Sequence, residues 1–295
     1  MNPAFGKTGP LRTPIPSPSR TLARTAVILA AYAVLASAAL AVVPSAWAAL
    51  PVLGCAFILS GFLNAGHDCV HSTHFGAAWW DRIAGAVWCT LILVNFTIYR
   101  RQHLVHHRFP ATAGDSEEHV QFASLHSYLY AQSGVGFWMS IFRRIVRTWQ
   151  GELPASINSP LWARAARIDN LVISLWLATC GAATLWQTRA MFIAYWLPLL
   201  LYPAFVLFFS LAEHFDLADE QMPWPRARNV RSNAVVRFFQ WHANYHAVHH
   251  RRPALPAFAL QSAHGADTER VDPLETSYLA FHFRLARRLV LSAPV

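Results

Sequence analysis

The stretch Asn244-Tyr245-His246-Ala247-Val248-His249-His250 carries three histidines at positions i, i+3 and i+4. On a helix these positions share one face, about one turn apart, so the three imidazole rings would meet at one point. Convergent imidazoles are a common way to bind a transition metal. The alternative for this stretch alone is a solvated, histidine-rich loop.

Two further histidine boxes lie earlier in the chain. His103-Leu104-Val105-His106-His107 repeats the H-x-x-H-H spacing, and His67-Asp68-Cys69-Val70-His71 places two histidines at i and i+4. With His214, the three boxes hold nine of the 15 histidines. Chance is a poor explanation for three such boxes in one chain, so the sequence predicts a metal site.

The composition is that of a membrane protein. Of 295 residues, 55% are hydrophobic and only 13% are charged, whereas soluble domains are about 25% charged. The net charge of +9 comes almost entirely from arginine. The arginines flank apolar segments, as in cytoplasmic loops of membrane proteins, which argues against a nucleic-acid partner. The four cysteines form no C-x-x-C pair, so neither a zinc knuckle nor a redox motif is indicated.

Four apolar segments predict an all-α integral membrane protein with four transmembrane helices. The segments are residues 25–43, 46–65, 168–187 and 190–212. A cleavable signal peptide is the alternative for the first segment, which is, however, longer than a usual signal sequence. Residues 1–20 are rich in proline and predict a disordered tail, and residues 21–295 predict a single membrane domain.

Residues 83–99 are apolar but short for a membrane span. If they crossed the membrane, the first two histidine boxes would lie on opposite sides and could not share a site. We therefore expect a re-entrant or interfacial helix here. Amphipathic helices lying on the lipid surface are expected within residues 108–167, around Arg143, Arg144 and Arg147, and at 274–291.

The distribution of arginine supports one topology. With four spans, only Arg189 of the 24 lysine and arginine residues falls in a loop on the far side of the membrane. The positive-inside rule then makes the other side the cytoplasm. We expect the N-terminus, a histidine-rich cap and the C-terminus to be cytoplasmic.

Nine histidines are too many ligands for one metal ion and suit two. Imidazole binds iron, copper, nickel and zinc. Each ligating ring also needs a hydrogen-bond partner for its second nitrogen. Candidates for that supporting role are Asp68, Asp115, Glu117, Glu213, Asp216 and Asn244. His74 is a possible extra ligand, whereas the remaining histidines, His282 among them, are expected to be surface or interfacial residues.

The three boxes together resemble those of the membrane fatty acid desaturase and hydroxylase superfamily. Pro253-Ala254-Leu255-Pro256 is similar to the proline-bearing sequence that follows the last box in that family, and Ala212-Glu213-His214 resembles its additional Glu-His element. The resemblance implies a four-span fold with a cytoplasmic di-iron site and O2-dependent attack on a C–H bond of a lipid chain. The iron ligands that it implies are His67, His71, His103, His106, His107, His214, His246, His249 and His250.

The leading hypothesis is a desaturase acting on a fatty acyl or similar lipid chain. A hydroxylase or ketolase of a carotenoid or alkane remains open, because both reactions begin with the same hydrogen abstraction. A non-catalytic membrane metal-binding protein is the third alternative. The chain has no haem-attachment or ferredoxin-type cysteine spacing. A separate electron donor of the ferredoxin, rubredoxin or cytochrome type, with its reductase, is therefore implied.

One departure from the family pattern follows the last box. Arg251-Arg252 stands before Pro253 where the family has an apolar pair. We expect this difference to reflect an altered substrate entrance or a contact with a polar head group. The departure concerns the substrate and leaves the predicted metal site unchanged.

Overall fold

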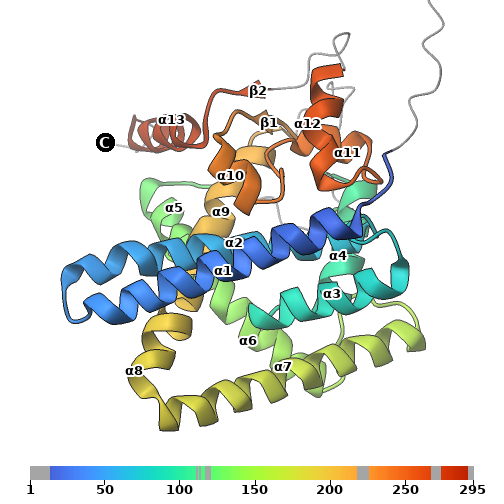
Figure 1. The fold of residues 1–295 in the computed structure, drawn as a ribbon. Helices are drawn as coiled ribbons and strands as arrows, with labels where there is room; N and C mark the ends of the chain where they lie inside the picture. Colours follow the sequence, from blue (N-terminus) through green and yellow to red (C-terminus); the bar gives the residue numbers. More distant parts are fainter. Residues whose placement is uncertain are drawn as a thin grey trace, which may run out of the picture.

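A computed structural model describes residues 14–110, 112, 114–116, 121–217, 226–266 and 274–291. The elements in chain order are α1 (Pro18–Val42), η1 (Ala46–Ala48), α2 (Ala49–Val70), α3 (Ala78–Leu91), α4 (Phe96–Arg108), α5 (Leu125–Gln132), α6 (Val135–Trp149), α7 (Pro160–Trp186), α8 (Thr188–Met191), η2 (Phe192–Trp196), α9 (Leu197–His214), β1 (Asn229–Val230), α10 (Ala234–Phe239), α11 (His246–Arg251), α12 (Ala257–Ala266), β2 (Leu274–Glu275) and α13 (Tyr278–Leu291). Figure 1 shows their arrangement. Residues 1–13 of the predicted tail and Glu117 lie outside the described residues.

Within the described residues, four helical stretches are long and apolar enough to cross a membrane, which confirms the predicted all-α, four-span fold. They are Pro18–Val42, Ala46–Val70, Pro160–Trp186 and Thr188–His214. At about 1.5 Å per residue, each exceeds the roughly 30 Å hydrocarbon core. The first begins seven residues before the predicted apolar run, and the third begins eight residues before it. Polar first turns, invisible to a hydropathy pattern, account for the difference.

The first two spans lie side by side as a hairpin (Figure 1). At Gly54 of α2, an added Cβ would lie 2.9 Å from the side chain of Leu35 on α1. A small residue here therefore lets the two helices approach closely, as is common between membrane helices. The hairpin carries the end of α2, and with it the first histidine box, back to the side on which α1 begins.

Helices α3 and α4 form a sharply bent pair, with an angle of 107° between them. Leu93 has a positive φ of 63° in the turn, and the Asn95 side chain accepts a hydrogen bond from the Ile98 amide to cap α4. The tyrosine hydroxyls of Tyr195 and Tyr202 donate to the carbonyls of Leu91 and Ile92. Such bonds satisfy backbone groups that a break in a helix would otherwise leave unpaired within the membrane.

The bent pair returns the chain to the side from which it started. Its outer end carries His103 and His107, which lie beside His67 and His71 at the end of α2. A complete crossing would separate these two pairs by the thickness of the membrane. The geometry therefore agrees with the predicted re-entrant segment.

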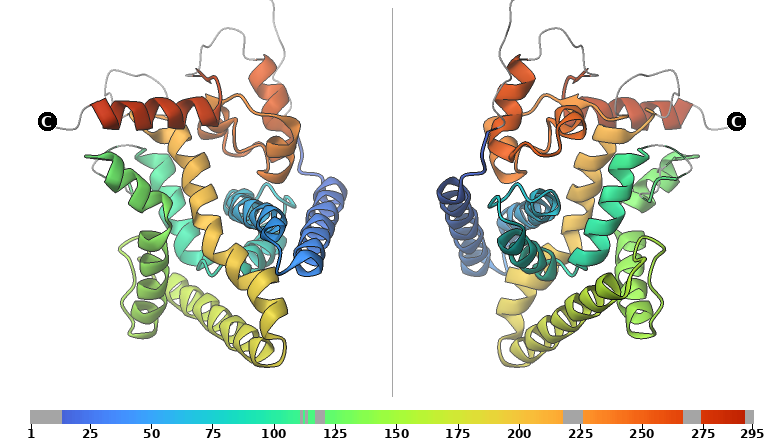
Figure 2. Two further views of the ribbon diagram at one scale, coloured as in Figure 1. Left: turned by 90° about the vertical axis from the view of Figure 1, so that its left-hand side faces the viewer. Right: turned by 90° about the vertical axis from the view of Figure 1, so that its right-hand side faces the viewer.

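The C-terminal elements gather at one end of the molecule, over the end of α9 (Figure 2). Strands β1 and β2 form a short parallel pair, with Asn229 opposite Leu274. Helix α13 is amphipathic: it buries Tyr278, Phe281 and Leu285 and exposes Leu279 and Phe283. Helix α6 exposes apolar side chains in the same way. Both agree with the amphipathic helices expected on the lipid surface.

Candidate metal centre

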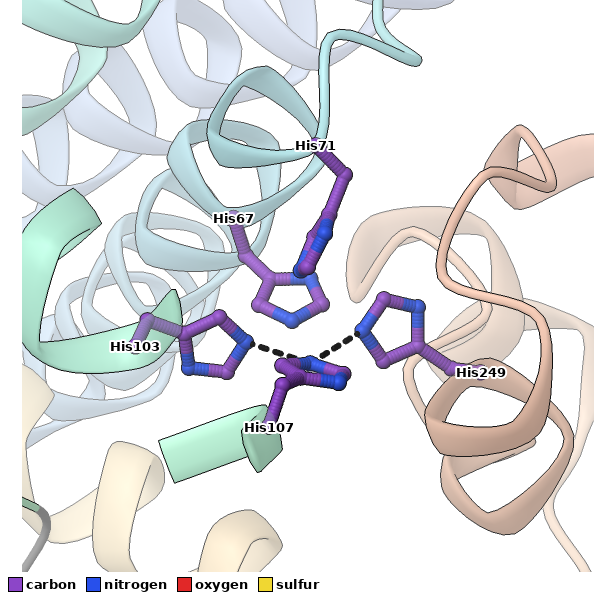
Figure 3. Close-up of side chains that lie close together, drawn as sticks. All are labelled: His67, His71, His103, His107 and His249. Carbon is purple, nitrogen blue, oxygen red and sulfur yellow. Dashed lines mark hydrogen bonds between the residues drawn. The ribbon is translucent and has the colours of Figure 1, made fainter. Parts of the chain in front are cut away.

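Five histidines from three helices form the first of two histidine groups. His67 and His71 come from the end of α2, His103 and His107 from α4, and His249 from α11. One ligand nitrogen of each lies within 4.8 Å of all the others. Figure 3 shows the five rings converging on a common space. The Nε2 atom of His107 lies 2.9 Å from that of His103 and 3.0 Å from that of His249.

The second histidine group consists of His106, His214 and His250, whose ligand nitrogens also lie within 4.8 Å of one another. His246 adjoins this group. Its Nε2 atom lies 2.7 Å from that of His214 and 3.1 Å from that of His250. The two groups contain eight of the nine histidines that the family resemblance implies as ligands, and the ninth, His246, lies beside the second group.

The H-x-x-H-H spacing explains how one helix serves both groups. Positions i and i+4 are only about 40° apart around a helix, whereas i+3 is turned away by about 100° from i+4. On α4, His103 and His107 enter the first group and His106 the second. On α11 the assignment is reversed: His250 lies beside His246, while His249 enters the first group. The two boxes thus interlock between the groups.

The donor set fits a metal. The Nε2 atoms of His67 and His71 are buried and have no hydrogen-bond partner among the described residues. An unsatisfied buried polar atom costs about 1–3 kcal/mol, and two such atoms pointing into a group of further ring nitrogens would be expensive. A cation bound by those nitrogens removes this cost. The described geometry therefore suits metal ions better than an empty polar cluster.

The electrostatic environment keeps these rings in the form that binds metal. Burial, together with the neighbouring histidines, holds the pKa values of His71, His249 and His250 well below the ordinary value. The rings are therefore neutral at physiological pH, with a lone pair on one nitrogen. Neutral imidazole is the metal-ligating form.

Two carboxylates hold ring nitrogens that face away from the groups. Both carboxylate oxygens of Asp115 lie 3.0 Å from Nδ1 of His106, and both side chains are 2% exposed. Glu213 Oε2 lies 3.6 Å from Nδ1 of His246, and the Tyr278 hydroxyl donates to Glu213 Oε1 at 3.0 Å. A carboxylate on the second nitrogen fixes the orientation of a ligating ring and raises its basicity.

The other supporting candidates have different contacts. Asp68 lies 3.9 Å from Nδ1 of His74, Asp216 pairs with Arg288, and the Asn244 amide donates to the Val230 carbonyl. None of these contacts involves a ring of the two histidine groups. Glu117 lies outside the described residues.

His74 is buried away from both groups. Its Nε2 atom accepts a hydrogen bond from the Trp88 indole at 3.3 Å, and its ring packs against Trp241 at a centroid distance of 4.7 Å. These contacts indicate a polar residue within the core and not an additional ligand. His282 was expected at the surface and is instead buried, bonded to the Tyr128 hydroxyl and the Phe208 carbonyl.

One supporting residue has no signal in the sequence. Asn229 of β1 is fully buried, and its side-chain oxygen accepts hydrogen bonds from the amides of Ala247 and Val248. These amides belong to the first turn of α11, whose backbone donors have no partner within the helix. Asn229 thus fixes the helix that carries the third box, from a position 18 residues away in the chain.

A cavity of about 520 Å³ opens beside the histidines. Four helices line it with residues at helical spacing: Ser60, Leu63, Asn64 and His67 on α2, Ile98, Tyr99, Gln102 and His103 on α4, Phe137, Ser140, Ile141 and Arg144 on α6, and Val206, Phe209, Ser210 and Glu213 on α9. His214 and His246 complete the wall on the side of the second group. Its volume is in the range of binding sites for small molecules. The apolar part of the cavity is continuous with the part lined by the histidine rings.

A helical membrane fold that buries two histidine groups beside an apolar cavity defines a membrane metalloprotein. A family model described as fatty acid desaturase matches residues 43–282. The chain belongs to the fatty acid desaturase family, and is thus a multi-pass membrane oxidoreductase of the desaturase or hydroxylase type with a lipid substrate. A comparison with curated proteins found no significant match.

Proposed function

We propose that the chain is an O2-dependent di-iron desaturase that introduces a double bond into a fatty acyl or similar lipid chain. The observation that carries the proposal is the opening of one largely apolar cavity onto both histidine groups. Two iron ions bound there would supply the O2-dependent oxidation of a C–H bond. The residues of the chain bind those ions, position the substrate and exclude water.

The proposed ligands divide between two ions. The first ion would be bound by His67, His71, His103, His107 and His249, and the second by His106, His214, His246 and His250. The close approaches of the Nε2 atoms within each set support this division. Asp115 and Glu213 act through the rings: their contacts with Nδ1 hold His106 and His246 in place, which leaves Nε2 as the nitrogen that would bind the second ion.

The cavity positions the substrate by exclusion of water and by shape. Leu63, Ile98, Phe137, Ile141 and Val206 form its apolar walls. A hydrocarbon chain that enters buries its apolar surface there, at a gain of about 0.8 kcal/mol per methylene group. Because His67 and His103 belong to the same wall, a chain held in the cavity presents its C–H bonds to the side where the ions would lie.

We further propose an orientation of the protein in the membrane and a class of electron donor. Residues 21–295 form one membrane domain, with the N-terminus, both histidine groups and the C-terminus in the cytoplasm. Electrons come from a separate ferredoxin, rubredoxin or cytochrome-type protein and its reductase. The concentration of arginine on the side of the histidines supports this orientation.

The metal content of the detergent-purified protein tests the proposal, with a His249→Ala variant as control. We expect close to two irons per wild-type chain, and a marked loss in the variant while it still inserts into the membrane. One zinc ion, one haem or no metal on intact protein would contradict the di-iron assignment.

Hydroxylation is the second candidate reaction. Ser140 and Ser210 in the cavity wall favour it, because their hydroxyls offer polar contacts to an oxygenated chain. The mass of the product separates the two reactions. Loss of two hydrogens identifies a desaturase, whereas gain of one oxygen identifies a hydroxylase.

A further inference from the structure

The cavity beside the histidine groups contains one arginine, Arg144 of α6. Phe137, Ile141 and Arg144 occupy positions i, i+4 and i+7, so they form one stripe of α6 that faces the cavity. Arg143, the preceding residue, is exposed and does not line it. The position of Arg144 in the cavity wall is therefore set by the helix, and is not a general property of this basic segment.

Within the part of the chain that the structure describes, the charge of Arg144 has no acidic partner. Among the described residues, no carboxylate lies within ion-pair distance of its guanidinium, whereas the nearby Arg147 lies 3.6 Å from Glu152. Burial and the neighbouring Arg147 lower the pKa of Arg144, but an arginine remains protonated in proteins. A partly buried cation without a counter-ion is energetically unfavourable. An anionic ligand would supply the counter-ion and remove that cost.

Several other polar groups of the cavity wall already have hydrogen-bond partners in the protein. The Gln240 amide donates to the Phe57 carbonyl and the Ser60 hydroxyl, and the Asn64 amide donates to the Gln240 side-chain oxygen. The one carboxylate in the wall, that of Glu213, is bonded to Tyr278 and lies against His246. Among the described residues, the cavity thus offers an occupant apolar walls, uncharged polar groups such as Ser140 and Ser210, and the cation of Arg144.

We propose that the substrate is a single-chain amphiphile with an anionic head group, and that Arg144 binds that head group. This inference rests on the proposed function, since it assigns the substrate class of the same cavity. The planar guanidinium can bind a carboxylate or a phosphate through two parallel hydrogen bonds. The hydrocarbon chain then lies along the apolar walls toward the histidines.

Retention of radiolabelled amphiphiles by the intact purified protein tests the proposal without turnover. The probes are oleate, oleyl alcohol and oleyl phosphate, which share a chain and differ in the head group. We expect the wild type to bind oleate or oleyl phosphate roughly 10- to 100-fold more tightly than oleyl alcohol, the range for a hydrogen-bonded charge. Preference between the two anions identifies the head group as a carboxylate or a phosphate.

Variants of α6 test whether Arg144 is the residue that causes the preference for anionic probes. Arg144→Gln removes the preference for the anionic probes, Arg144→Lys retains part of it, and the matched control Arg143→Gln keeps it in full. Equal binding of oleate, oleyl phosphate and oleyl alcohol by the wild type would overturn the proposal, and this comparison needs no variant. An unchanged preference in folded Arg144→Gln protein would also overturn it.

Metal content measured on the same samples separates this inference from the proposed function. A His249→Ala protein that loses iron but keeps its preference for the anion supports Arg144 independently of the ligand assignment. Wild-type protein with iron but no preference retains the proposed function and refutes the anionic substrate.

Discussion

The histidine rings are held in place by carboxylates that do not themselves face the groups. Asp115 contacts Nδ1 of His106 with both oxygens at 3.0 Å in a site closed to solvent. Glu213 holds His246 less closely, at 3.6 Å. At the scale of single residues, the orientation of a ligand therefore depends on an acid that no histidine pattern reveals.

Replacing Asp115 with asparagine is expected to lower metal affinity about 10- to 100-fold, because the neutral amide fixes the ring less well and reduces its basicity. Competition with a chelator, read as the metal retained per chain, measures the change. Asp216→Asn is the matched control, since Asp216 pairs with Arg288 on an exposed surface. Equal metal retention by both variants and the wild type would show that Asp115 has no positioning role.

The buried rings predict a pH dependence of stability. The native pKa values of His71, His249 and His250 lie well below the ordinary value because of burial and neighbouring rings. The unfolded chain, with pKa values near 6.5, therefore binds protons that the native metal-free protein does not. The contribution of these three rings to stability should be constant above that pH and should fall as the pH drops below about 6.5.

Thermal unfolding of the chelator-treated protein between pH 8 and pH 5 measures this effect. The Tm should decrease below about pH 6.5, and the decrease should be smaller in a His249→Gln, His250→Gln variant. A Tm that stays constant over the whole range would contradict the neutral, buried state of these rings.

At the scale of elements, the bent pair α3–α4 brings the second box to the first. Gly85 of α3 packs against Phe96 of α4, where an added Cβ would lie 2.3 Å from the ring. Phe96 is 1% exposed and cannot turn away into solvent. Close contact at this glycine thus fixes the angle at which α4 leaves the turn.

Gly85→Ala is expected to destabilise the protein by about 1–3 kcal/mol, the usual cost of overpacking a buried site, and to lower the Tm by several degrees. Gly181→Ala on α7 is the control, because nothing lies within 4 Å of its added Cβ. Its Tm should be unchanged or higher, since alanine favours a helix. A Tm for Gly85→Ala equal to that of the control would contradict close packing at the bend.

At the scale of the whole molecule, the order of spans and returns places three distant boxes at one end. The α1–α2 hairpin brings the first box there, the bent pair brings the second, and α9 followed by the C-terminal elements brings His214 and the third. A change in the number of crossings would separate the boxes. The proposed function also requires that this end of the molecule faces the cytoplasm.

Cysteine labelling tests the orientation. A membrane-impermeant maleimide should label Arg189→Cys in sealed right-side-out vesicles, and should label Arg287→Cys only after permeabilisation. Both positions are exposed. The four natural cysteines are buried, so the wild type serves as the background control. Labelling of Arg287→Cys from the outside would place the C-terminus on the wrong side for a cytoplasmic site.

The membrane fold, the four spans and the residue types of the candidate metal site could be predicted from the amino-acid sequence. Each rests on local information: hydropathy follows from the transfer of neighbouring side chains into lipid, and the H-x-x-H-H spacing follows from the pitch of one helix. The start of α1 at Pro18 differed from the predicted tail boundary because a first turn need not be apolar.

How these parts combine could not be predicted from the sequence and became visible in the folded chain. It placed eight of the nine histidines in two groups with His246 beside the second, joined Asp115 to His106, directed Asp216 and Asn244 elsewhere and buried His282. It also turned Arg144, one of several arginines on α6, toward the cavity. Some of these contacts join residues that are distant in the chain, and others depend on which side of a helix a residue occupies. Both depend on how the helices pack against one another. The sequence of a single segment does not contain that information.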